Sequence, residues 1–117
     1  MGTLTAGSVV LVPFPFSDLT QSKRRPAVLL ASVAHGDVVL CQVTSNAYGD
    51  PLAVGIDDAD FQHGGLRHAS FARPGKLFSA SSALVVATVG RLTREKHRGI
   101  LEAIVALLYE GLRNETS

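Results

Sequence analysis

The sequence predicts a mainly β protein, a small antiparallel barrel or strongly bent sheet with one C-terminal helix packed on it. Short apolar segments rich in β-branched residues alternate with turn-forming residues over about residues 7–91. A single amphipathic segment follows over about residues 94–113. The chain of 117 residues suits one core and contains no repeat or linker, so residues 1–117 are predicted to form a single domain.

Three strands are predicted in the first part of the chain. Residues 8–14 are apolar and β-branched and end at a Pro-Phe-Pro step, whereas residues 17–24 lack periodicity and indicate a loop. Residues 25–33 and 37–45 predict two further strands, which are joined by a tight turn at the sequence HGD. These two strands are therefore expected to pair as a hairpin.

Short strands and turns alternate in the middle of the chain. Residues 52–56 predict a fourth strand, and residues 57–65 can hold one helical turn before a glycine break. Residues 69–81 offer two short strand pieces on either side of the sequence RPGK. Residues 83–93 predict another strand, with a kink at Gly90.

The C-terminal segment has the pattern of an amphipathic helix. Thr93 suits the N-cap, and Glu95 suits the first turn, where its charge complements the helix dipole. His97 is expected on the exposed side of this helix. Apolar residues recur at helical spacing on one face, which we expect to pack on the sheet: Ile100, Leu101, Ile104, Val105, Leu108 and Leu112.

The composition and the missing motifs exclude several classes of protein. The formal net charge is +1, so any site for a polyanion must be a local concentration of basic residues. Cys41 is the only cysteine, which excludes a disulfide framework and suits a reducing cytosol. No apolar run approaches the roughly 20 residues of a membrane span, and no signal peptide is recognisable. We therefore expect a cytoplasmic protein without a membrane partner.

No sequence motif indicates a cofactor or a metal. The chain has no Walker loop, no dinucleotide fingerprint, no metalloprotease motif and no nucleophile elbow. Its histidines lack the spacing of metal ligands: His35, His63, His68 and His97. We therefore expect neither a cofactor nor a metal site, and we interpret Cys41 as a small core residue.

Three consecutive basic residues, Lys23, Arg24 and Arg25, stand at the start of the second predicted strand. Arg25 precedes Pro26, which stiffens the backbone, and a guanidinium held at a strand edge is well placed to bind a phosphate through two hydrogen bonds. Lys23 and Arg24 would add attraction for a polyanion. The alternatives stay open: Arg25 as a surface or ion-paired arginine, and its two neighbours as residues that only confer solubility.

Two hydroxyl residues, Thr44 and Ser45, end the third predicted strand. They lie at the open end of the hairpin, the same end as Arg25, because counting back from the turn places Ala27 near Val43. A cation and a hydroxyl group are therefore expected on one rim. In the alternative interpretation, Thr44 is only a strand former and Ser45 only a turn residue.

Four segments carry a resemblance to a known family: GSVVLVPFPFSDLTQSKRRPAVLL, CQVTS, DFQHGGLRHASFARPGKLFS and VGRLT. Together, in this order and from about residue 7 to residue 112, they resemble the MazF/PemK toxins of type II toxin–antitoxin systems. The resemblance implies an SH3-like barrel with a C-terminal helix. It also implies a metal-independent, sequence-specific endoribonuclease for single-stranded RNA. In such enzymes the 2′-hydroxyl of the RNA attacks the phosphodiester and leaves 2′,3′-cyclic phosphate and 5′-hydroxyl ends.

The resemblance also implies roles for single residues. Arg25 matches the family's catalytic arginine, and Thr44, with Ser45 beside it, matches the hydroxyl residue at the end of the third strand. Because an arginine stays protonated at neutral pH, Arg25 is expected to stabilise developing charge. Asp18 is a candidate for removing the 2′-proton, although it can instead cap its own turn. Gly75 is a departure, because relatives often carry an acidic residue at this place.

Further residues are expected to contact RNA or to select its bases. The candidates for the RNA backbone are Ser17, Lys23, Arg24, Arg73 and Lys76; for Arg73 and Lys76 the alternative is that they only cover a loop. The aromatic candidates for base recognition, whose alternative role is core packing, are Phe16, Tyr48 and Phe71.

The resemblance finally implies partners. It implies a homodimer with RNA in a groove at or near the dimer interface, and an antitoxin whose acidic segment competes for the same basic rim and shares in DNA binding. Two other functions stay open: a CcdB-like toxin directed at gyrase, and a non-catalytic barrel that serves as a binding module. The presence of both Arg25 and Thr44 favours RNA cleavage over the gyrase-directed function, and the binding module stays open.

Overall fold

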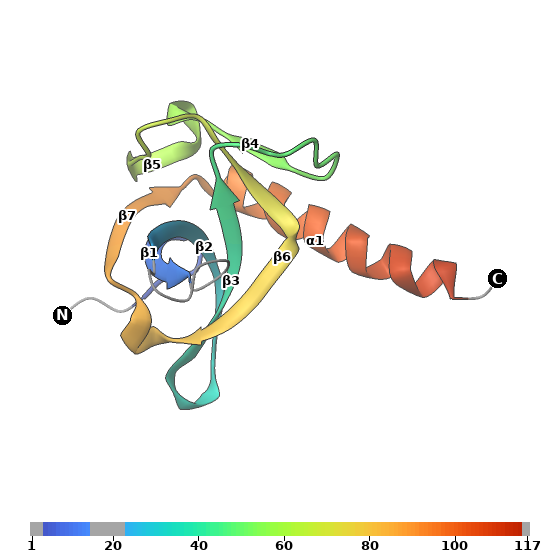
Figure 1. The fold of residues 1–117 in the computed structure, drawn as a ribbon, viewed down its shortest axis with the longest axis horizontal. Helices are drawn as coiled ribbons and strands as arrows, with labels where there is room; N and C mark the ends of the chain where they lie inside the picture. Colours follow the sequence, from blue (N-terminus) through green and yellow to red (C-terminus); the bar gives the residue numbers. More distant parts are fainter. Residues whose placement is uncertain (1–3, 15–22, 116–117) are drawn as a thin grey trace.

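The computed structural model describes residues 4–14 and 23–115 of the chain. Within these residues, seven strands form one antiparallel sheet in the order β4-β6-β3-β2-β1-β7-β5. The sheet curls into a half-barrel, which Figure 1 shows end-on, so the predicted mainly β fold is confirmed. The strands are β1 (Ser8–Phe14), β2 (Lys23–Val33), β3 (Asp37–Thr44), β4 (Val54–Ile56), β5 (Phe61–Gly64), β6 (Ser70–Ser81) and β7 (Ala87–Leu92).

The predicted hairpin is present as β2 and β3, which are joined by a 3-10 turn (Ala34–Gly36). Ala27 pairs with Gln42, one residue away from the expected position. A bulge at Leu30 inserts an extra residue into β2 and so accounts for the shift. The sequence predicts the hairpin, but its register depends on the bulge at Leu30, which no nearby residue pattern predicts.

The structure has one strand, β6, where the sequence predicts two short pieces. The interruption expected at RPGK is nevertheless real, because residues 73–76 bulge out of the ladder opposite Gln42 alone. Pro74 is buried in this bulge and has no N–H group to donate to the ladder. A Cβ atom at Gly75 would lie 3.9 Å from Leu107 Cδ2, so the bulge lies close to the C-terminal helix.

Strand β5 was not expected from the sequence. The single helical turn expected in this region is present at Asp58–Asp60, and β5 follows it directly. β5 pairs with β7 near Gly64 and Gly90. A Cβ atom at Gly90 would come within 2.8 Å of the Phe61 ring, so a glycine is needed for this close approach.

Strand β7 is shorter than predicted, beginning at Ala87 and not at residue 83. The preceding residues Ser82–Leu84 form a 3-10 turn. The Ser81 hydroxyl caps this turn by accepting a hydrogen bond of 3.2 Å from the Ala83 N–H group.

The core is divided between the two faces of the curled sheet. One cluster contains residues of α1 and alternate residues of the central strands: Val9, Val28, Cys41, Val43, Ile56, Ala72, Leu92, Ile100 and Ile104. The intervening residues of the same strands form the second cluster: Val10, Val12, Ala27, Leu29, Val38 and Leu40. Because successive side chains of a strand point to opposite faces, β1 is buried on both sides, which explains its unbroken apolar sequence.

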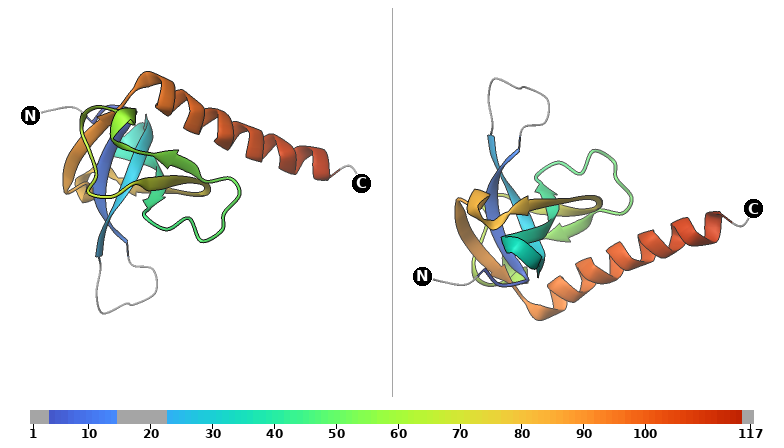
Figure 2. Two further views of the ribbon diagram at one scale, coloured as in Figure 1. Left: turned by 90° about the horizontal axis from the view of Figure 1, so that it is seen from above. Right: turned by 90° about the horizontal axis from the view of Figure 1, so that it is seen from below.

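Helix α1 (Arg94–Asn114) confirms the predicted C-terminal helix. Thr93 is the N-cap, and its Oγ1 atom accepts a hydrogen bond of 3.2 Å from the Lys96 N–H group. The first half of the helix packs on the sheet through Ile100 and Ile104. The second half projects away from the half-barrel, as both views in Figure 2 show.

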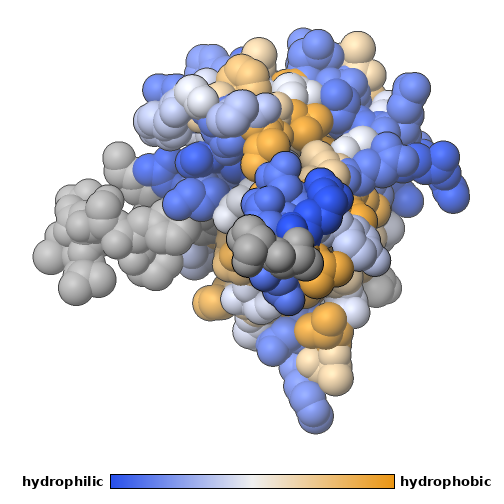
Figure 3. Space-filling view, turned by 90° about the vertical axis from the view of Figure 1, so that its right-hand side faces the viewer, coloured by the Kyte–Doolittle hydropathy of each residue, from blue (hydrophilic) through white to orange (hydrophobic). Residues whose placement is uncertain are grey.

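The expectation that the whole apolar face of α1 packs on the sheet is wrong for its second half. The exposed large apolar residues there are Val105, Leu108, Tyr109 and Leu112. Figure 3 views the molecule from the side toward which α1 points, and hydrophobic side chains reach the surface on this side. Among the described residues, no helix is long and apolar enough to cross a membrane.

His97 is half-buried, which corrects the expectation that it lies on the exposed side of α1. It precedes Ile100 and Ile104 by three and seven positions, so it lies on the packed face of the helix. Its ring packs against Gly7 at the start of β1, where a Cβ atom would lie 3.0 Å from His97 Nδ1. The absence of a side chain at Gly7 makes room for the imidazole.

Candidate nucleic-acid interface

An open pocket of about 570 Å³ lies where the start of β2, the end of β3 and the connection from β5 to β6 meet. We call it the rim pocket. Its polar lining residues are Arg24, Arg25, Thr44, Ser45, Tyr48, Arg67, His68 and Ser70. The structure thus brings together Arg25, Thr44 and Ser45, which the sequence places at one end of the hairpin.

Arg24 and Arg25 lie at the start of β2, opposite Pro13 and Val12 of β1. Both side chains are exposed, and among the described residues neither forms an ion pair. Two guanidinium groups without a carboxylate partner leave their donors available to an anionic ligand. The ion-paired alternative for Arg25 therefore finds no support among the residues that the structure describes.

Thr44 is nearly buried at the end of β3, whereas Ser45 is exposed. The Thr44 hydroxyl donates a hydrogen bond of 3.1 Å to the Asn46 carbonyl oxygen and accepts one of 3.2 Å from the Asn46 N–H group. Thr44 therefore orders the turn that follows β3 as well as lining the pocket. The hydroxyl of Ser45 is the more accessible of the two.

Arg73 supports the loop after β3 instead of pointing freely to solvent. Its Nε atom donates a hydrogen bond of 3.0 Å to Asp50 Oδ2, and its guanidinium carbon lies 5.9 Å from the centre of the Tyr48 ring. The hydrogen bond from the Leu52 N–H group, and then the bond from Arg73, hold the pKa of Asp50 below its ordinary value. Arg73 therefore links a carboxylate and an aromatic ring of one loop.

Tyr48 is the aromatic side chain of the rim pocket. It is 69% exposed and adopts a left-handed backbone conformation with φ 54°. The Asn46 side chain stabilises this conformation, because its Oδ1 atom accepts a hydrogen bond of 2.9 Å from the Tyr48 N–H group. Phe71, by contrast, is half-buried in β6 and does not line the pocket.

The remaining predicted contacts are less well placed or cannot be assessed. Lys76 is exposed on the bulge near α1 and is not part of the rim pocket. Lys23 is the first residue of β2 and pairs with Phe14. Phe16, Ser17 and Asp18 lie outside the described residues, so the role of Asp18 stays a prediction.

Arg67 and His68 line the rim pocket but were not singled out in the sequence. Both are exposed and lie just before β6, separated from it by Ala69, and the β6 residue Phe71 pairs with Thr44. The signal was available in principle, because two basic residues stand just before a strand. It could be used only after β6 was known to be the neighbour of β3.

Cys41 is completely buried, which confirms its assignment to the core. Burial raises the pKa of its thiol to about 11. The thiol lies 3.2 Å from the Arg73 carbonyl oxygen, to which it donates a hydrogen bond. A thiol with this pKa is not a nucleophile at neutral pH. Within residues 4–14 and 23–115, no cluster of three or more histidine, cysteine or acidic side chains could hold a metal ion.

Comparison with known proteins identifies the fold as that of the MazF toxins. MazF from Deinococcus radiodurans (Form-I) is 23% identical, with 92% of this chain and 98% of that chain covered and a TM-score of 0.71. The MazE-MazF structure (Form-II) from the same organism gives 22% identity, coverage of 92% and 97%, and a TM-score of 0.73. An endoribonuclease in complex with its cognate antitoxin, from a mycobacterial species, is 14% identical, with 92% of this chain and 95% of that chain covered and a TM-score of 0.68.

A family model described as "PemK-like, MazF-like toxin of type II toxin-antitoxin system" matches residues 5–108. The chain therefore belongs to this toxin family, whose members are ribonucleases that pair with antitoxins. No curated protein sequence matches the chain.

Proposed function

We propose that this toxin is a sequence-specific, metal-independent endoribonuclease that cleaves single-stranded RNA in the cytoplasm. The observation that carries the proposal is the rim pocket, in which Arg24 and Arg25 lie without ion-pair partners among the described residues and share a lining with Thr44 and Ser45. Such a lining suits a phosphodiester, because guanidinium groups bind its non-bridging oxygens and hydroxyl groups donate to them.

The proposed reaction needs no nucleophile from the protein. The RNA 2′-oxygen attacks the adjacent phosphorus and the bond from phosphorus to the 5′-oxygen breaks. The departing 5′-oxygen takes up a proton from water, so that 2′,3′-cyclic phosphate and 5′-hydroxyl ends result. Arg25 stabilises the extra negative charge on the phosphorane, since it stays protonated throughout. The exposed hydroxyl of Ser45 donates to a phosphate oxygen. The Thr44 hydroxyl already donates to the Asn46 carbonyl oxygen, so it orients the 2′-hydroxyl group as an acceptor.

The 2′-proton needs an acceptor. Asp18 is the candidate that the sequence suggests, and His68 is a second candidate because its exposed imidazole lines the rim pocket. Gly75, where relatives often carry an acidic residue, lies on the bulge near α1 and is not among the pocket residues. A pH–rate profile of Asp18→Asn and His68→Gln separates the two candidates, because only loss of the true base removes the acidic limb of the profile.

Tyr48 is the proposed platform for base recognition. Its ring is largely exposed at the rim pocket, while the Arg73 guanidinium lies at 5.9 Å from its centre. A base of single-stranded RNA can stack on an aromatic ring that the protein already holds in place. Tyr48→Ala is therefore expected to alter the preferred cleavage sequence more than Phe71→Ala does.

Assembly into a homodimer and capture by an acidic antitoxin complete the proposal. The second half of α1 exposes Val105, Leu108, Tyr109 and Leu112, which surround a shallow apolar hollow of about 420 Å³. A continuous apolar face of this kind indicates burial in an assembly. The basic rim suits an acidic polypeptide as well as RNA, which accounts for inhibition by competition.

The test is cleavage of a long unstructured RNA in the presence of EDTA. Wild-type protein is expected to cut, and the new 5′ ends should accept a kinase label without prior phosphatase treatment. Arg25→Ala should lower kcat by about 10²- to 10³-fold, with an unchanged melting temperature because the residue is exposed. Arg113→Ala is a control that removes the same charge at the end of α1.

The alternative functions make different predictions in the same samples. A gyrase-directed toxin would inhibit DNA supercoiling and leave the RNA intact. A non-catalytic binding module would do neither. Cleavage that persists at the wild-type rate in Arg25→Ala, with the same product ends, would contradict the proposed role of the rim pocket.

A further inference from the structure

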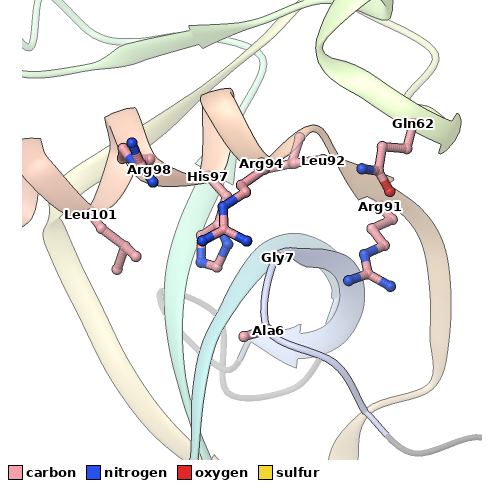
Figure 4. A pocket seen from close by; sticks show the side chains of 9 residues that line it. All are labelled: Ala6, Gly7, Gln62, Arg91, Leu92, Arg94, His97, Arg98 and Leu101. Atoms are coloured by element: carbon pink, nitrogen blue, oxygen red, sulfur yellow. The ribbon is translucent and has the colours of Figure 1, made fainter.

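A second basic pocket, of about 430 Å³, lies at the corner where β7 ends and α1 begins. We call it the corner pocket. Arg91 comes from β7, and Arg94 and Arg98 come from the first two turns of α1. Figure 4 shows Arg91 and Arg94 on either side of Gly7, with Arg98 one turn further along the helix. The three arginines lie within residues 91–98 of the sequence, but only the fold shows that a strand and a helix bring them to one pocket.

Arg91, Arg94 and Arg98 form no ion pair with a carboxylate among the described residues. Asp60, near the start of α1, is already engaged, since its Oδ2 atom lies 3.7 Å from Lys96 Nζ and accepts a hydrogen bond from the Asp57 N–H group. Glu95 is exposed and is not part of the pocket lining. The corner pocket is therefore a local concentration of positive charge.

The positions of Arg94 and Arg98 are unfavourable for the free protein. Arg94 occupies the first turn of α1, where the helix dipole disfavours a cation. Arg94 and Arg98 are also four residues apart, so that two like charges occupy neighbouring positions on the helix surface. An anion between the guanidinium groups offsets the unfavourable interaction of Arg94 with the helix dipole and the repulsion between Arg94 and Arg98. It also offsets the repulsion between Arg91 and Arg94. The arrangement therefore favours an anion-bound state.

His97 forms an uncharged side of the corner pocket. Its Nε2 atom is buried without a hydrogen-bond partner in the described structure, and its ring packs against Gly7. Burial in the first place, and then the charges of Arg91 and Arg94, hold its pKa below the ordinary value of 6.5. Arg98, on the same helix, adds a further positive charge to the lining. His97 is thus a local reporter of an anion, because an anion at the arginines offsets their repulsion and raises this pKa.

We propose that the corner pocket is a second phosphate-binding site, which holds a backbone phosphate of the RNA outside the rim pocket. This inference rests on the proposed ribonuclease function. Guanidinium groups from a strand and a helix line the same pocket, where they can bind the oxygens of a phosphodiester. The apolar part of the lining is Ala6, Gly7, Leu92 and Leu101, and it contains no Phe, Tyr or Trp ring on which a base could stack. The ligand is therefore recognised by its backbone charge and not by its sequence.

The two pockets are neighbours along the same strands. Val89 of β7 lines the rim pocket, and Arg91, two residues later, lines the corner pocket. The rise of a strand separates these two Cα atoms by about 7 Å. Similarly, Gln62 of β5 lines the corner pocket, and Gly65, just after β5, lines the rim pocket. A strand of RNA that leaves the rim pocket along β7 meets the corner pocket next.

The test compares two RNAs that cannot be cleaved because the 2′-oxygen at the mapped cleavage site is methylated. The short RNA spans only the cleavage site, and the extended RNA carries several more nucleotides on either side. In the double variant Arg91→Ala/Arg94→Ala, affinity for the extended RNA should fall roughly tenfold or more, and affinity for the short RNA should stay unchanged. The slope of log K against log salt should decrease by about 0.7 for each lost phosphate contact.

Two control variants accompany this measurement. Arg91→Lys/Arg94→Lys keeps the charge and should recover part of the affinity, whereas Arg113→Ala should behave as wild type. The His97 imidazole signals in an NMR titration of the wild-type protein should report a raised pKa on addition of the extended RNA. The same titration with inorganic phosphate shows whether a free phosphate ion fills the pocket. If inorganic phosphate raises the pKa of His97 and the extended RNA does not, the proposal is overturned.

Three further outcomes overturn the proposal. In the first, the double variant loses the same affinity for the short and the extended RNA. In the second, it binds both RNAs as wild type does. In the third, it loses affinity only for an acidic peptide such as oligoglutamate. The proposed ribonuclease function is judged separately, by cleavage of the unmethylated RNA by wild-type protein. Cleavage together with any of these three outcomes therefore refutes the corner pocket alone.

Discussion

The Arg73 guanidinium connects Asp50 and Tyr48 across the loop after β3, with Nε 3.0 Å from Asp50 Oδ2 and the guanidinium carbon 5.9 Å from the centre of the Tyr48 ring. Arg73 comes from the bulge in β6, so the loop is held by an element far away in the sequence. The loop carries Tyr48 into the rim pocket. The position of the proposed base platform therefore depends on an ion pair outside the pocket.

Asp50→Asn is expected to loosen this loop while leaving the pocket residues in place. The variant loses the ion pair with Arg73 but keeps a side-chain oxygen for the Leu52 N–H group. KM for RNA should rise several-fold and kcat should change less, because Tyr48 binds RNA in the proposal and does not react. Steady-state kinetics and limited proteolysis of the loop provide the measurement.

The same ion pair predicts a pH dependence. The pKa of Asp50 is lowered from 3.8 in the folded protein, so its contribution to stability is present above that value and is lost as pH falls through the lower, folded value. Asp50→Asn should therefore show a smaller loss of stability on acidification than wild type does. Equal acid sensitivity of the two proteins would contradict a stabilising role for the pair.

Thr44 is expected to act through the turn as well as through the pocket. Thr44→Val removes the hydroxyl that both donates to and accepts from Asn46, and should lower the free energy of unfolding by about 1 kcal/mol. Thr44→Ser keeps this hydroxyl and should restore both stability and cleavage. Chemical denaturation and RNA cleavage are measured on the same preparations. If Thr44→Val were inactive yet as stable as wild type, its hydroxyl would serve the reaction and not the turn.

His97 predicts a loss of stability in mild acid. Its pKa is lowered from 6.5 by burial and by neighbouring arginines, so the unfolded chain takes up a proton that the folded chain resists. The melting temperature should therefore fall as pH drops below about 6.5, and the fall should be smaller in His97→Asn. His63→Asn, at an exposed histidine, is the matched control. The experiment needs a buffer without phosphate, because an anion in the corner pocket would mask the effect.

Ile100 and Leu108 separate the packed half of α1 from its projecting half. Ile100 is completely buried, so Ile100→Ala should lower the free energy of unfolding by about 2–5 kcal/mol. Leu108 is 62% exposed in the single chain. Leu108→Ala should therefore change the free energy of unfolding of a monomer by no more than about 0.5 kcal/mol. Urea denaturation at low and high protein concentration is the measurement. A large effect of Leu108→Ala that appears only at high concentration would indicate that this face is buried between two copies.

Local features of the fold were predictable because their causes are local. The unbroken apolar sequence of β1 indicates a strand buried on both faces, and Thr93 followed by helical spacing defines the start of α1. The hairpin of β2 and β3 brings Arg25 toward Thr44 in any register close to the observed one. The family resemblance used the same segments and led to the same fold.

Other features could not be predicted, because they depend on contacts between distant segments. The apolar face of α1 looks continuous in the sequence, but the sheet is too short to cover it, so Leu108 and Leu112 are exposed. β5 is a strand only because β7 lies beside it. Arg73 is a candidate phosphate ligand in the sequence because it carries a guanidinium group. Only the tertiary structure shows that this group forms an ion pair with Asp50.

The sequence by itself determined the family, the strand-rich fold with a terminal helix, and the end of the hairpin at which a basic site lies. Only the tertiary structure decided which cations are available to a ligand. It engages Arg73 with Asp50, adds Arg67 to the rim pocket, and gathers Arg91 and Arg94 into the corner pocket. The physical reason is that charge is a property of a residue, whereas availability depends on the partners that the folded chain brings within a few ångströms.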